Sequence, residues 1–232
     1  MYNIYLTGDT HGDMNRVINF ANKINASEND IFIILGDVGL NYYGNYRDIN
    51  LKKQISNIKA TLFCIHGNHE MNPEYMKSMK TKEYFNGIVF YEEDFPNILY
   101  AKDGEIYNIN DKSFIVLGGA YSVDKFIRLE MGAKWFQDEQ MSNDVKDRCI
   151  ENIKSNNWKI DYVLSHTTPY NYMPIDMFLS SIDQSKVDKS MENWLQYIED
   201  NLTYKHWYAG HYHCERTTNN LTIMFTNWIL LE

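Results

Sequence analysis

The chain of 232 residues has few cysteines and no internal repeat, low-complexity tract or linker. Its three cysteines are Cys64, Cys149 and Cys214, and no two of them form a CxxC pair. A small, odd number of cysteines argues against a disulfide-stapled secreted domain and fits a reducing cytosol. Cys64 and Cys214 are expected to be small packing residues, the second of them near the polar motifs described below.

Long apolar runs and an excess of basic residues are also missing. No apolar run reaches the roughly 18–20 residues that span a bilayer. The chain starts directly with a strand pattern, so we expect no signal peptide and a cytoplasmic location. The net charge of −9 gives no support to an extended nucleic-acid surface, although a local basic patch stays open. The length fits a single domain over residues 1–232.

The first part of the chain alternates predicted strands and helices. Continuous apolar runs predict buried strands at 2–6, 31–35 and 62–65. Apolar residues in helical phase predict helices at 13–24 and 49–58. This order favours parallel strands joined by right-handed crossovers, and hence an α/β fold.

The pattern changes after the third of these strands. Short strands split by turn residues are expected in hairpins or a meander, at 88–91, 98–100, 105–109 and 113–117. Further helices are expected at 138–155 and 187–198, and further strands at 162–164, 206–209, 221–225 and 229–231. The stretches 39–47 and 118–135 are predicted to be long loops, which often carry function.

Five short polar motifs each follow an apolar, β-rich run. They are Gly8-Asp9-Thr10-His11, Gly36-Asp37, Gly67-Asn68-His69-Glu70, Ser165-His166 and Gly210-His211-Tyr212-His213. Because strand ends in an α/β sheet converge on one edge, we expect these side chains to meet there. A mixture of Asp, His and Asn in this arrangement predicts one dinuclear metal centre.

Each motif has an ordinary structural explanation when it is taken alone. A lone Gly-Asp is more often a turn, and a lone His at a strand end is usually a hydrogen-bonded surface or core residue. Folding by itself favours Ser, Asn, Asp or Gly at strand ends and would not place so many histidines there. The joint pattern therefore favours the metal centre over packing.

In this order, Asp-x-His, Gly-Asp, Gly-Asn-His-Glu, His and Gly-His-x-His resemble the motifs of the calcineurin-like metallophosphoesterase superfamily, from Asp9 to His213. A stretch beginning at Gly118-Gly119 is similar to one in the small bacterial and phage-type members. The resemblance implies a four-layer α/β/β/α sandwich of two mixed sheets flanked by helices, with two metals at its top.

The resemblance also implies a role for each motif residue. The first metal would be bound by Asp9, His11 and His213, and the second by Asn68, His166 and His211, with Asp37 bridging the two. His69 matches the family's catalytic histidine, which is not a ligand. The family favours Mn or an Fe-containing pair, and the same mixed nitrogen and oxygen ligands suit Zn or Ni.

The implied chemistry is hydrolysis of a phosphate mono- or diester. Two ions about 3.5–4 Å apart share a water and lower its pKa, and the resulting hydroxide attacks phosphorus directly. His69 would donate a proton to the leaving oxygen, a role worth about 10²–10⁴-fold. The substrate is expected to be small or nucleotide-type, and phosphatase and phosphodiesterase activities both stay open.

The sequence departs from the family pattern after Gly36-Asp37. Leu40 stands where the protein serine/threonine phosphatase branch has an Asp that orients the catalytic histidine, and no Arg follows at the matching place. The group that orients His69 is therefore open, and phosphoproteins are disfavoured as substrates.

Basic side chains that could hold a phosphate are scarce near the motifs, and Lys125 and Arg128 are the best candidates. The alternative is a surface loop whose Asp124 and Lys125 are merely solvated. Several tyrosines could stack on a substrate ring or pack in the interior, namely Tyr42, Tyr43, Tyr46 and Tyr121. His66 and His206 are expected to be structural.

A second class of function is a catalytically silent scaffold or binding protein with the same fold. Such relatives usually lack one of the metal-binding residues or the catalytic histidine. Here all seven ligand positions and His69 are filled, which favours the enzyme.

Overall fold

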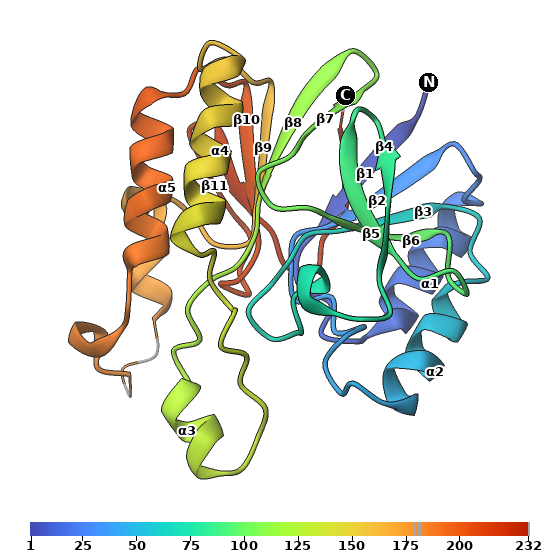
Figure 1. Ribbon diagram of the computed structural model, residues 1–232, viewed down its shortest axis with the longest axis horizontal. Helices are drawn as coiled ribbons and strands as arrows, with labels where there is room; N and C mark the ends of the chain where they lie inside the picture. Colours follow the sequence, from blue (N-terminus) through green and yellow to red (C-terminus); the bar gives the residue numbers. More distant parts are fainter. Residues whose placement is uncertain (179, 181, 232) are drawn as a thin grey trace.

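The computed structural model describes residues 1–178, 180 and 182–231, and it consists of two sheets packed face to face between pairs of helices (Figure 1). Helices α1 and α2 cover one sheet, and helices α4 and α5 cover the other. This confirms the predicted α/β/β/α sandwich of two mixed sheets flanked by helices.

The first sheet has seven strands in the order β13-β1-β2-β3-β6-β5-β4. Neighbours from β1 to β6 are parallel, and β13, β5 and β4 pair antiparallel. The strands are β1 (Asn3–Thr7), β2 (Asp30–Ile34), β3 (Thr61–Cys64), β4 (Lys80–Tyr84), β5 (Gly87–Tyr91), β6 (Ile98–Ala101) and β13 (Ile229–Leu231).

The second sheet has six strands in the order β11-β12-β10-β9-β8-β7. Its four central strands are parallel, and the two edge strands pair antiparallel. The strands are β7 (Ile106–Ile109), β8 (Lys112–Leu117), β9 (Tyr162–Ser165), β10 (His206–Ala209), β11 (Arg216–Thr218) and β12 (Leu221–Ile223).

Helices α1 and α4 begin at side-chain caps. The carboxylate of Asp13 accepts a hydrogen bond from the Arg16 amide, and the Ser142 hydroxyl accepts one from the Val145 amide. The α-helices are α1 (Met14–Ile24), α2 (Tyr46–Ile55), α3 (Lys125–Glu130), α4 (Asn143–Ser155) and α5 (Ser190–Asn201). The short 3₁₀ helices among the described residues are η1 (Pro73–Tyr75), η2 (Tyr170–Tyr172), η3 (Ile175–Met177) and η4 (Gln184–Lys186).

The core forms three layers because the central strands bury both faces. In β2, Ile31 and Ile33 pack between the two sheets, whereas Phe32 and Ile34 pack against α1 and α2. Strand β8 shows the same alternation, with Val116 between the sheets and Ile115 facing the α4–α5 layer. Burial on both faces explains why these strands read as continuous apolar runs.

The structure corrects several local predictions. Strands β6 and β7, which were expected among hairpin or meander strands, belong to different sheets, and so do β12 and β13. Strands β4 and β11 were not predicted, because both are largely exposed edge strands without an apolar alternation. Helix α3 lies in the stretch 118–135 that was predicted to be a loop, and it buries none of its residues.

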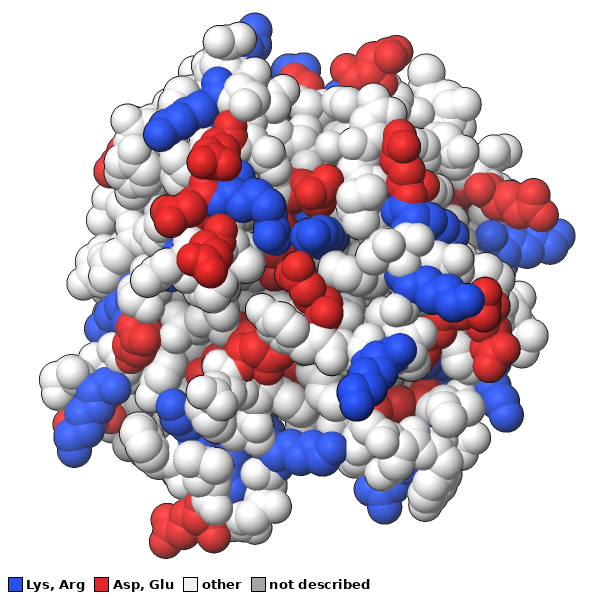
Figure 2. All heavy atoms as spheres, viewed as in Figure 1, with Lys and Arg blue, Asp and Glu red and all other residues white. Residues whose placement is uncertain are grey.

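The surface seen in Figure 2 shows basic and acidic side chains interspersed, and they do not gather there into a continuous basic patch. Among the described residues, none of the helices has the length and apolarity that a bilayer crossing requires.

Candidate metal centre

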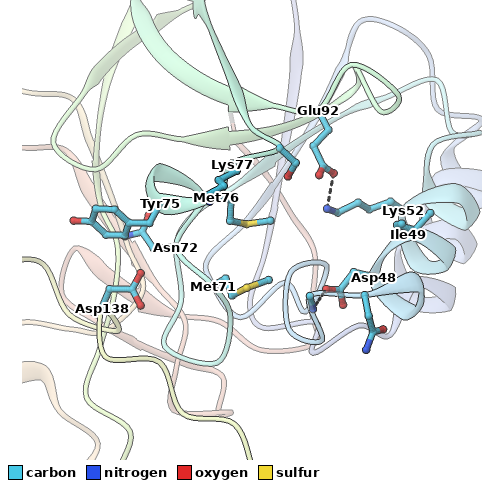
Figure 3. A pocket seen from close by; sticks show the side chains of 13 residues that line it. Asp48, Ile49, Lys52, Met71, Asn72, Tyr75, Met76, Lys77, Glu92 and Asp138 are labelled. Carbon is cyan, nitrogen blue, oxygen red and sulfur yellow. Dashed lines mark hydrogen bonds and ion pairs between the residues drawn. The ribbon is translucent and has the colours of Figure 1, made fainter.

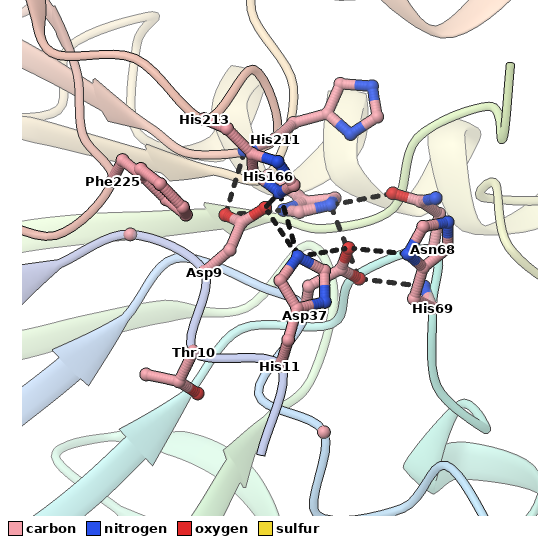
Figure 4. Close-up of polar contacts among 12 residues, drawn as sticks. Asp9, Thr10, His11, Asp37, Asn68, His69, His166, His211, His213 and Phe225 are labelled. Carbon is pink, nitrogen blue, oxygen red and sulfur yellow. Dashed lines mark hydrogen bonds and ion pairs between the residues drawn. The ribbon is translucent and has the colours of Figure 1, made fainter. Parts of the chain in front are cut away.

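The five polar motifs come together where strands from both sheets end (Figure 4). The loops after β1, β2 and β3 contribute from the first sheet, and those after β9 and β10 contribute from the second. Three groups of His and carboxylate side chains there bring possible ligand atoms within 4.8 Å of one another. The groups are Asp9, His11 and His213; His11, Asp37 and His69; and Asp9, Asp37 and His166.

The first group brings together residues that are far apart in the sequence, Asp9 and His11 near the N-terminus and His213 about two hundred residues later. The Nε2 atoms of His11 and His213 lie 2.8 Å apart, and His213 Nε2 lies 3.1 Å from Asp9 Oδ2. Burial lowers the pKa of His11, so its ring is neutral near pH 7. Two imidazole nitrogens that face each other beside a carboxylate form an arrangement that a bound cation stabilises.

Asp37 lies in the middle of the cluster and is almost fully buried. Its Oδ1 accepts a hydrogen bond of 2.7 Å from the His69 amide and lies 3.6 Å from His166 Nε2, while its Oδ2 lies 3.9 Å from His11 Nε2. One carboxylate oxygen therefore faces His166 and the other faces His11, as a bridging position requires. Burial opposes its ionisation, but the surrounding histidines, His166 first, hold the pKa of Asp37 far below its usual value.

His166 and Asn68 provide a test of whether a metal fits. His166 Nδ1 lies 2.8 Å from the carbonyl oxygen of Leu35, which can only accept, so Nδ1 carries a proton. The Asn68 amide donates from Nδ2 to the Ser122 hydroxyl at 2.8 Å, which turns Asn68 Oδ1 toward His166 Nε2 at 2.8 Å. In the neutral ring, Nε2 is an acceptor facing an acceptor.

Such a contact is stable only with a cation, either a second ring proton or a metal ion. Burial alone would lower the pKa of His166, but the carboxylates of Asp37 and Asp9 outweigh it and raise that pKa to about 9. These residues fit a metal ion. The His166 ring is held through Nδ1, and its Nε2 faces the amide oxygen of Asn68 and the carboxylate of Asp37.

His211 is placed differently from the other predicted ligands. Its amide donates to Asp9 Oδ1 at 2.9 Å, whereas its ring lies 5.0 Å from the His166 ring, centre to centre. Burial lowers the pKa of His211 to about 3, so the ring is neutral. The structure thus places the His211 ring beside that of His166, and its role as a ligand of the second metal stays a prediction.

Several of the predicted ligands share the same strained backbone conformation. Four of the predicted ligands have a left-handed backbone, with φ of 46° at His11, 45° at Asp37, 69° at His211 and 49° at His213. Such a conformation costs roughly 1–2 kcal/mol for a residue with a side chain. Strain of this kind persists where the surrounding structure fixes it, and it is concentrated at functional sites.

Two motif glycines allow the close approach of neighbouring loops. A Cβ on Gly36, whose φ is +94°, would collide with the imidazole of His166. A Cβ on Gly67 would collide with the backbone and carboxylate of Asp37. Each glycine thus makes room for a ligand from another motif, which explains why glycine precedes the polar residue in the sequence.

The comparisons with known proteins agree with this geometry. The model of the calcineurin-like phosphoesterase family matches residues 2–215. The chain belongs to this family. A crystal structure of the protein TT1561 of Thermus thermophilus covers 97% of this chain and 88% of its own, with 11% identity and a TM-score of 0.54, and so shares the fold. The family implies a dinuclear metal site and supports a metal-dependent phosphoesterase in general.

Two further solved structures are less similar. One is a phosphopantetheinyl hydrolase from Mycobacterium tuberculosis, covering 96% of this chain and 88% of its own, with 11% identity and a TM-score of 0.41. The other is a protein of unknown function from Aquifex aeolicus, covering 75% and 82%, with 13% identity and a TM-score of 0.36. A comparison with curated proteins found no match.

Within this calcineurin-like site, Leu40 cannot orient His69. Leu40 is fully buried among the residues that pack against α1 and α2. The neighbouring loop is held instead by buried Glu70, whose carboxylate accepts from the Val38 and Gly39 amides, each at 3.3 Å. Burial, assisted by Asp37, raises the pKa of Glu70 to about 7. Sequence reasoning gave Glu70 no role.

A different carboxylate, Asp124, faces His69. Asp124 Oδ1 lies 3.6 Å from His69 Nε2 and is buried without a closer partner. Its Oδ2 accepts a 2.7 Å hydrogen bond from Arg128 Nε, and Arg128 Nη2 lies 3.3 Å from His69 Nδ1. Sequence reasoning missed Asp124, although its spacing of four residues from Arg128 is that of a helical ion pair.

The two basic residues predicted for substrate binding are separated by the structure. Arg128 reaches His69, as described. The Lys125 ammonium instead lies over the Trp135 ring, 3.9 Å from its centre. A third basic residue, Arg16, has a structural role, since its guanidinium donates to the carbonyl oxygens of Gly8 and Asp9 at 2.9 Å each and so holds the first motif.

Two cavities border the site, and His69 lines both of them. The first, which we call the basic cleft, has a volume of about 580 Å³ and contains His11 together with Tyr42, Tyr43, Arg47 and Arg128. The second, which we call the apolar cavity, has a volume of about 570 Å³. It contains four predicted ligands, Asp37, Asn68, His211 and His213.

A third cavity, of about 510 Å³, contains none of the predicted ligands (Figure 3). It lies between α2 and η1, and its charged pair Lys52 and Glu92 is joined by an ion pair. Tyr46 is exposed on α2, and Tyr121 lies in the apolar cavity rather than with Tyr42 and Tyr43.

Proposed function

We propose that this protein is a dinuclear, metal-dependent phosphoesterase that hydrolyses a phosphate ester by direct attack of activated water. The proposed ligands are those that the motifs indicate: Asp9, His11 and His213 for one ion, Asn68, His166 and His211 for the other, and Asp37 between them. His69 is the proposed general acid. The observation that carries the proposal is the convergence of side-chain ligand atoms from the five motifs, with His166 Nε2 lying 2.8 Å from Asn68 Oδ1 and 3.6 Å from Asp37 Oδ1.

When bound, the two ions would lower the pKa of a shared water and polarise the phosphoryl oxygens. The side chains of the protein supply charge neutralisation, orientation and contacts to the phosphate. Asp9 and Asp37 neutralise the cations, and Leu35 fixes the tautomer of His166. Arg128, which borders His69 and the basic cleft, is placed to receive phosphoryl oxygens. Lys125 is a weaker candidate for substrate binding, since its ammonium lies over Trp135.

His69 would hold the proton for the leaving oxygen. Its Nδ1 lies 3.5 Å from Asp37 Oδ2 and therefore faces the ligand cluster, while Nε2 faces Asp124. To act as the acid, the ring must be an imidazolium: its Nε2 proton is directed to Asp124, and its Nδ1 proton is the one transferred to the leaving oxygen, which leaves the neutral ring. A bound phosphate would give Arg128 an anionic partner in place of the ring. We therefore propose that Asp124 is the positioning residue that replaces the carboxylate missing at Leu40.

The function is tested by loading the purified protein with Mn²⁺ or Fe²⁺, with Zn²⁺ and Ni²⁺ for comparison, and measuring release of nitrophenol from a nitrophenyl monoester and a diester. We expect turnover of at least one ester. His69→Ala should keep the bound metal, measured by elemental analysis, and lose most turnover. Full metal occupancy with no turnover of either ester would support the catalytically silent scaffold instead.

A further inference from the structure

The apolar cavity beside the ligand cluster carries an inference about the substrate, which rests on the proposed function. Its walls include Val123 and Ile127 on one side, and Met173, Met177 and Phe178 on the other. The Phe178 ring stacks on that of Tyr212 with 6.0 Å between centres. A cavity of this size and lining is typical of a site for an apolar ligand group.

The charges of the apolar cavity disfavour an anionic occupant. The carboxylates of Asp124 and Asp188 line it, and among the described lining residues Lys189 is the one lysine. The Lys189 ammonium donates to the carbonyl oxygen of Gln184 at 3.2 Å. A second anionic group on the substrate, placed in this cavity away from the ligand cluster, would meet repulsion here.

The basic cleft, which His69 also lines, has the opposite character. It contains the guanidinium groups of Arg47 and Arg128, and Arg47 lies over the Tyr43 ring, 5.0 Å from its centre. An anionic or planar part of a substrate fits this cleft. A phosphoryl group bound at the ligand cluster would therefore border two different cavities: the apolar cavity and the cationic, aromatic basic cleft.

From this asymmetry we infer that the substrate is a phosphate ester with one uncharged, apolar substituent, an alkyl, acyl or aryl group, that occupies the apolar cavity. The phosphoryl group lies at the ligand cluster. A nucleotide or other anionic substituent is accommodated in the basic cleft and not in this cavity.

The test measures the affinity of the Mn-loaded protein for methyl-, butyl- and octylphosphonate by calorimetry, which needs no turnover. Each buried methylene gives up to about a fourfold gain in affinity, so octylphosphonate should bind at least about tenfold more tightly than methylphosphonate. A carboxylate at the end of an otherwise identical eight-carbon arm should remove most of this gain. Affinity that does not depend on chain length, or an equal affinity for the carboxylate arm, overturns the inference.

Helix α3 offers a matched pair of variants. Ile127 and Leu129 are both apolar and 51% exposed, but only Ile127 is among the described residues that line the apolar cavity. Ile127→Asn should reduce the ratio of octyl to methyl affinity several-fold, and Leu129→Asn should keep it. Equal ratios in both variants overturn the assignment of this cavity.

The phosphonate measurements distinguish a failure of the inferred apolar substituent from a failure of the proposed phosphoesterase function. If methylphosphonate binds in a metal-dependent way and octylphosphonate binds no better, the inference fails while the phosphoesterase proposal stands. If no phosphonate binds the metal-loaded protein, both fail.

Discussion

The carboxylate of Asp124 faces the imidazole of His69 across 3.6 Å, from a loop that belongs to none of the five sequence motifs. Arg128 holds the other oxygen of this carboxylate at 2.7 Å. The ion pair fixes the Asp124 side chain, and burial leaves its Oδ1 with no nearer partner than the ring. This contact supports the proposal that His69 is oriented from the segment after β8, in place of the acidic residue that position 40 lacks.

The first prediction concerns this pair. Asp124→Asn should lower kcat by about ten- to a hundredfold, within the range of general acid catalysis, with the metal content unchanged. The loss should be larger for phenyl phosphate than for nitrophenyl phosphate, because the poorer leaving group depends more on protonation. Steady-state kinetics with both esters measures this. The control is Asp188→Asn, since the Asp188 carboxylate lies in the same cavity but accepts from the Ser190 amide. An equal loss on both esters would exclude a role through proton transfer.

The second prediction concerns metal removal. Chelation should lower the melting temperature, since a ligand that binds only the folded state stabilises it by about 2.7 kcal/mol at a hundredfold excess over its Kd. Asp37→Asn should abolish the response of the melting temperature to Mn²⁺, because this carboxylate faces both His166 and His11.

The control for this experiment is Asp161→Asn. Asp161 accepts hydrogen bonds from the amide and hydroxyl of Ser113 and pairs with Lys205, so this change should lower the baseline stability. It should leave the Mn²⁺ response intact. A normal response in the Asp37 variant would contradict the proposed bridging position.

The third prediction tests the backbone strain. His213 has a φ of 49° and is exposed, so its side chain can be removed without leaving a cavity. His213→Gly and His213→Ala both delete the imidazole and should both weaken metal binding. In the metal-free protein, the Gly variant should be more stable than the Ala variant by about 1 kcal/mol, since only glycine adopts this conformation freely. Urea denaturation of both variants measures the difference, and an Ala variant of equal stability would show that the site is not strained there.

The sequence predicted the parts of this molecule that depend on local pattern. The buried strands β1, β2 and β3 were found because their residues are apolar on both faces, and the predicted ligands lie together because the strand ends converge. Strand partners could not be found this way. Ile229–Leu231 pairs with β1 at the far end of the chain, a contact that no local pattern encodes.

The orientation of His69 was also beyond local pattern. Asp124 and His69 are far apart in sequence and on different strand ends, and Asp124 was read as a solvated loop residue. Helix α3 was read as loop because it buries no apolar face. Ile127 and Leu129 are equally exposed on this helix, and only the structure shows that Ile127 lines the apolar cavity. The extent of the domain, residues 1–232, and the cytoplasmic location stay predictions.

The last prediction concerns Glu192, which is buried in the wall of the apolar cavity. Its Oε1 accepts a 2.8 Å hydrogen bond from the Thr167 hydroxyl, and its Oε2 has no partner. Burial raises the pKa of Glu192 above its ordinary value of 4.5, and the Thr167 hydrogen bond only partly opposes this. The fold therefore favours the protonated form.

The sign of the pH dependence follows from that direction. Because the folded-state pKa is raised, the stability that Glu192 contributes is fully present below about pH 4.5 and is lost as the pH rises through the folded-state value. At pH 8 the ionised group carries an unpaired buried oxygen, which costs about 1–3 kcal/mol. Gln keeps an oxygen to accept from Thr167 and cannot ionise. Glu192→Gln should therefore raise the free energy of unfolding at pH 8 by about 1 kcal/mol and change it little at pH 4.

The measurement is urea denaturation of the metal-free protein at both pH values, so that metal binding does not contribute to the difference. Glu151→Gln, an exposed glutamate on α4, is the matched control and should change stability little at either pH. A Glu192 variant that gains equally at pH 4 and pH 8 would mean that the change acts through packing. A variant that loses stability at pH 8 would mean that the carboxylate is ionised and paired in the folded protein, and that burial does not raise its pKa.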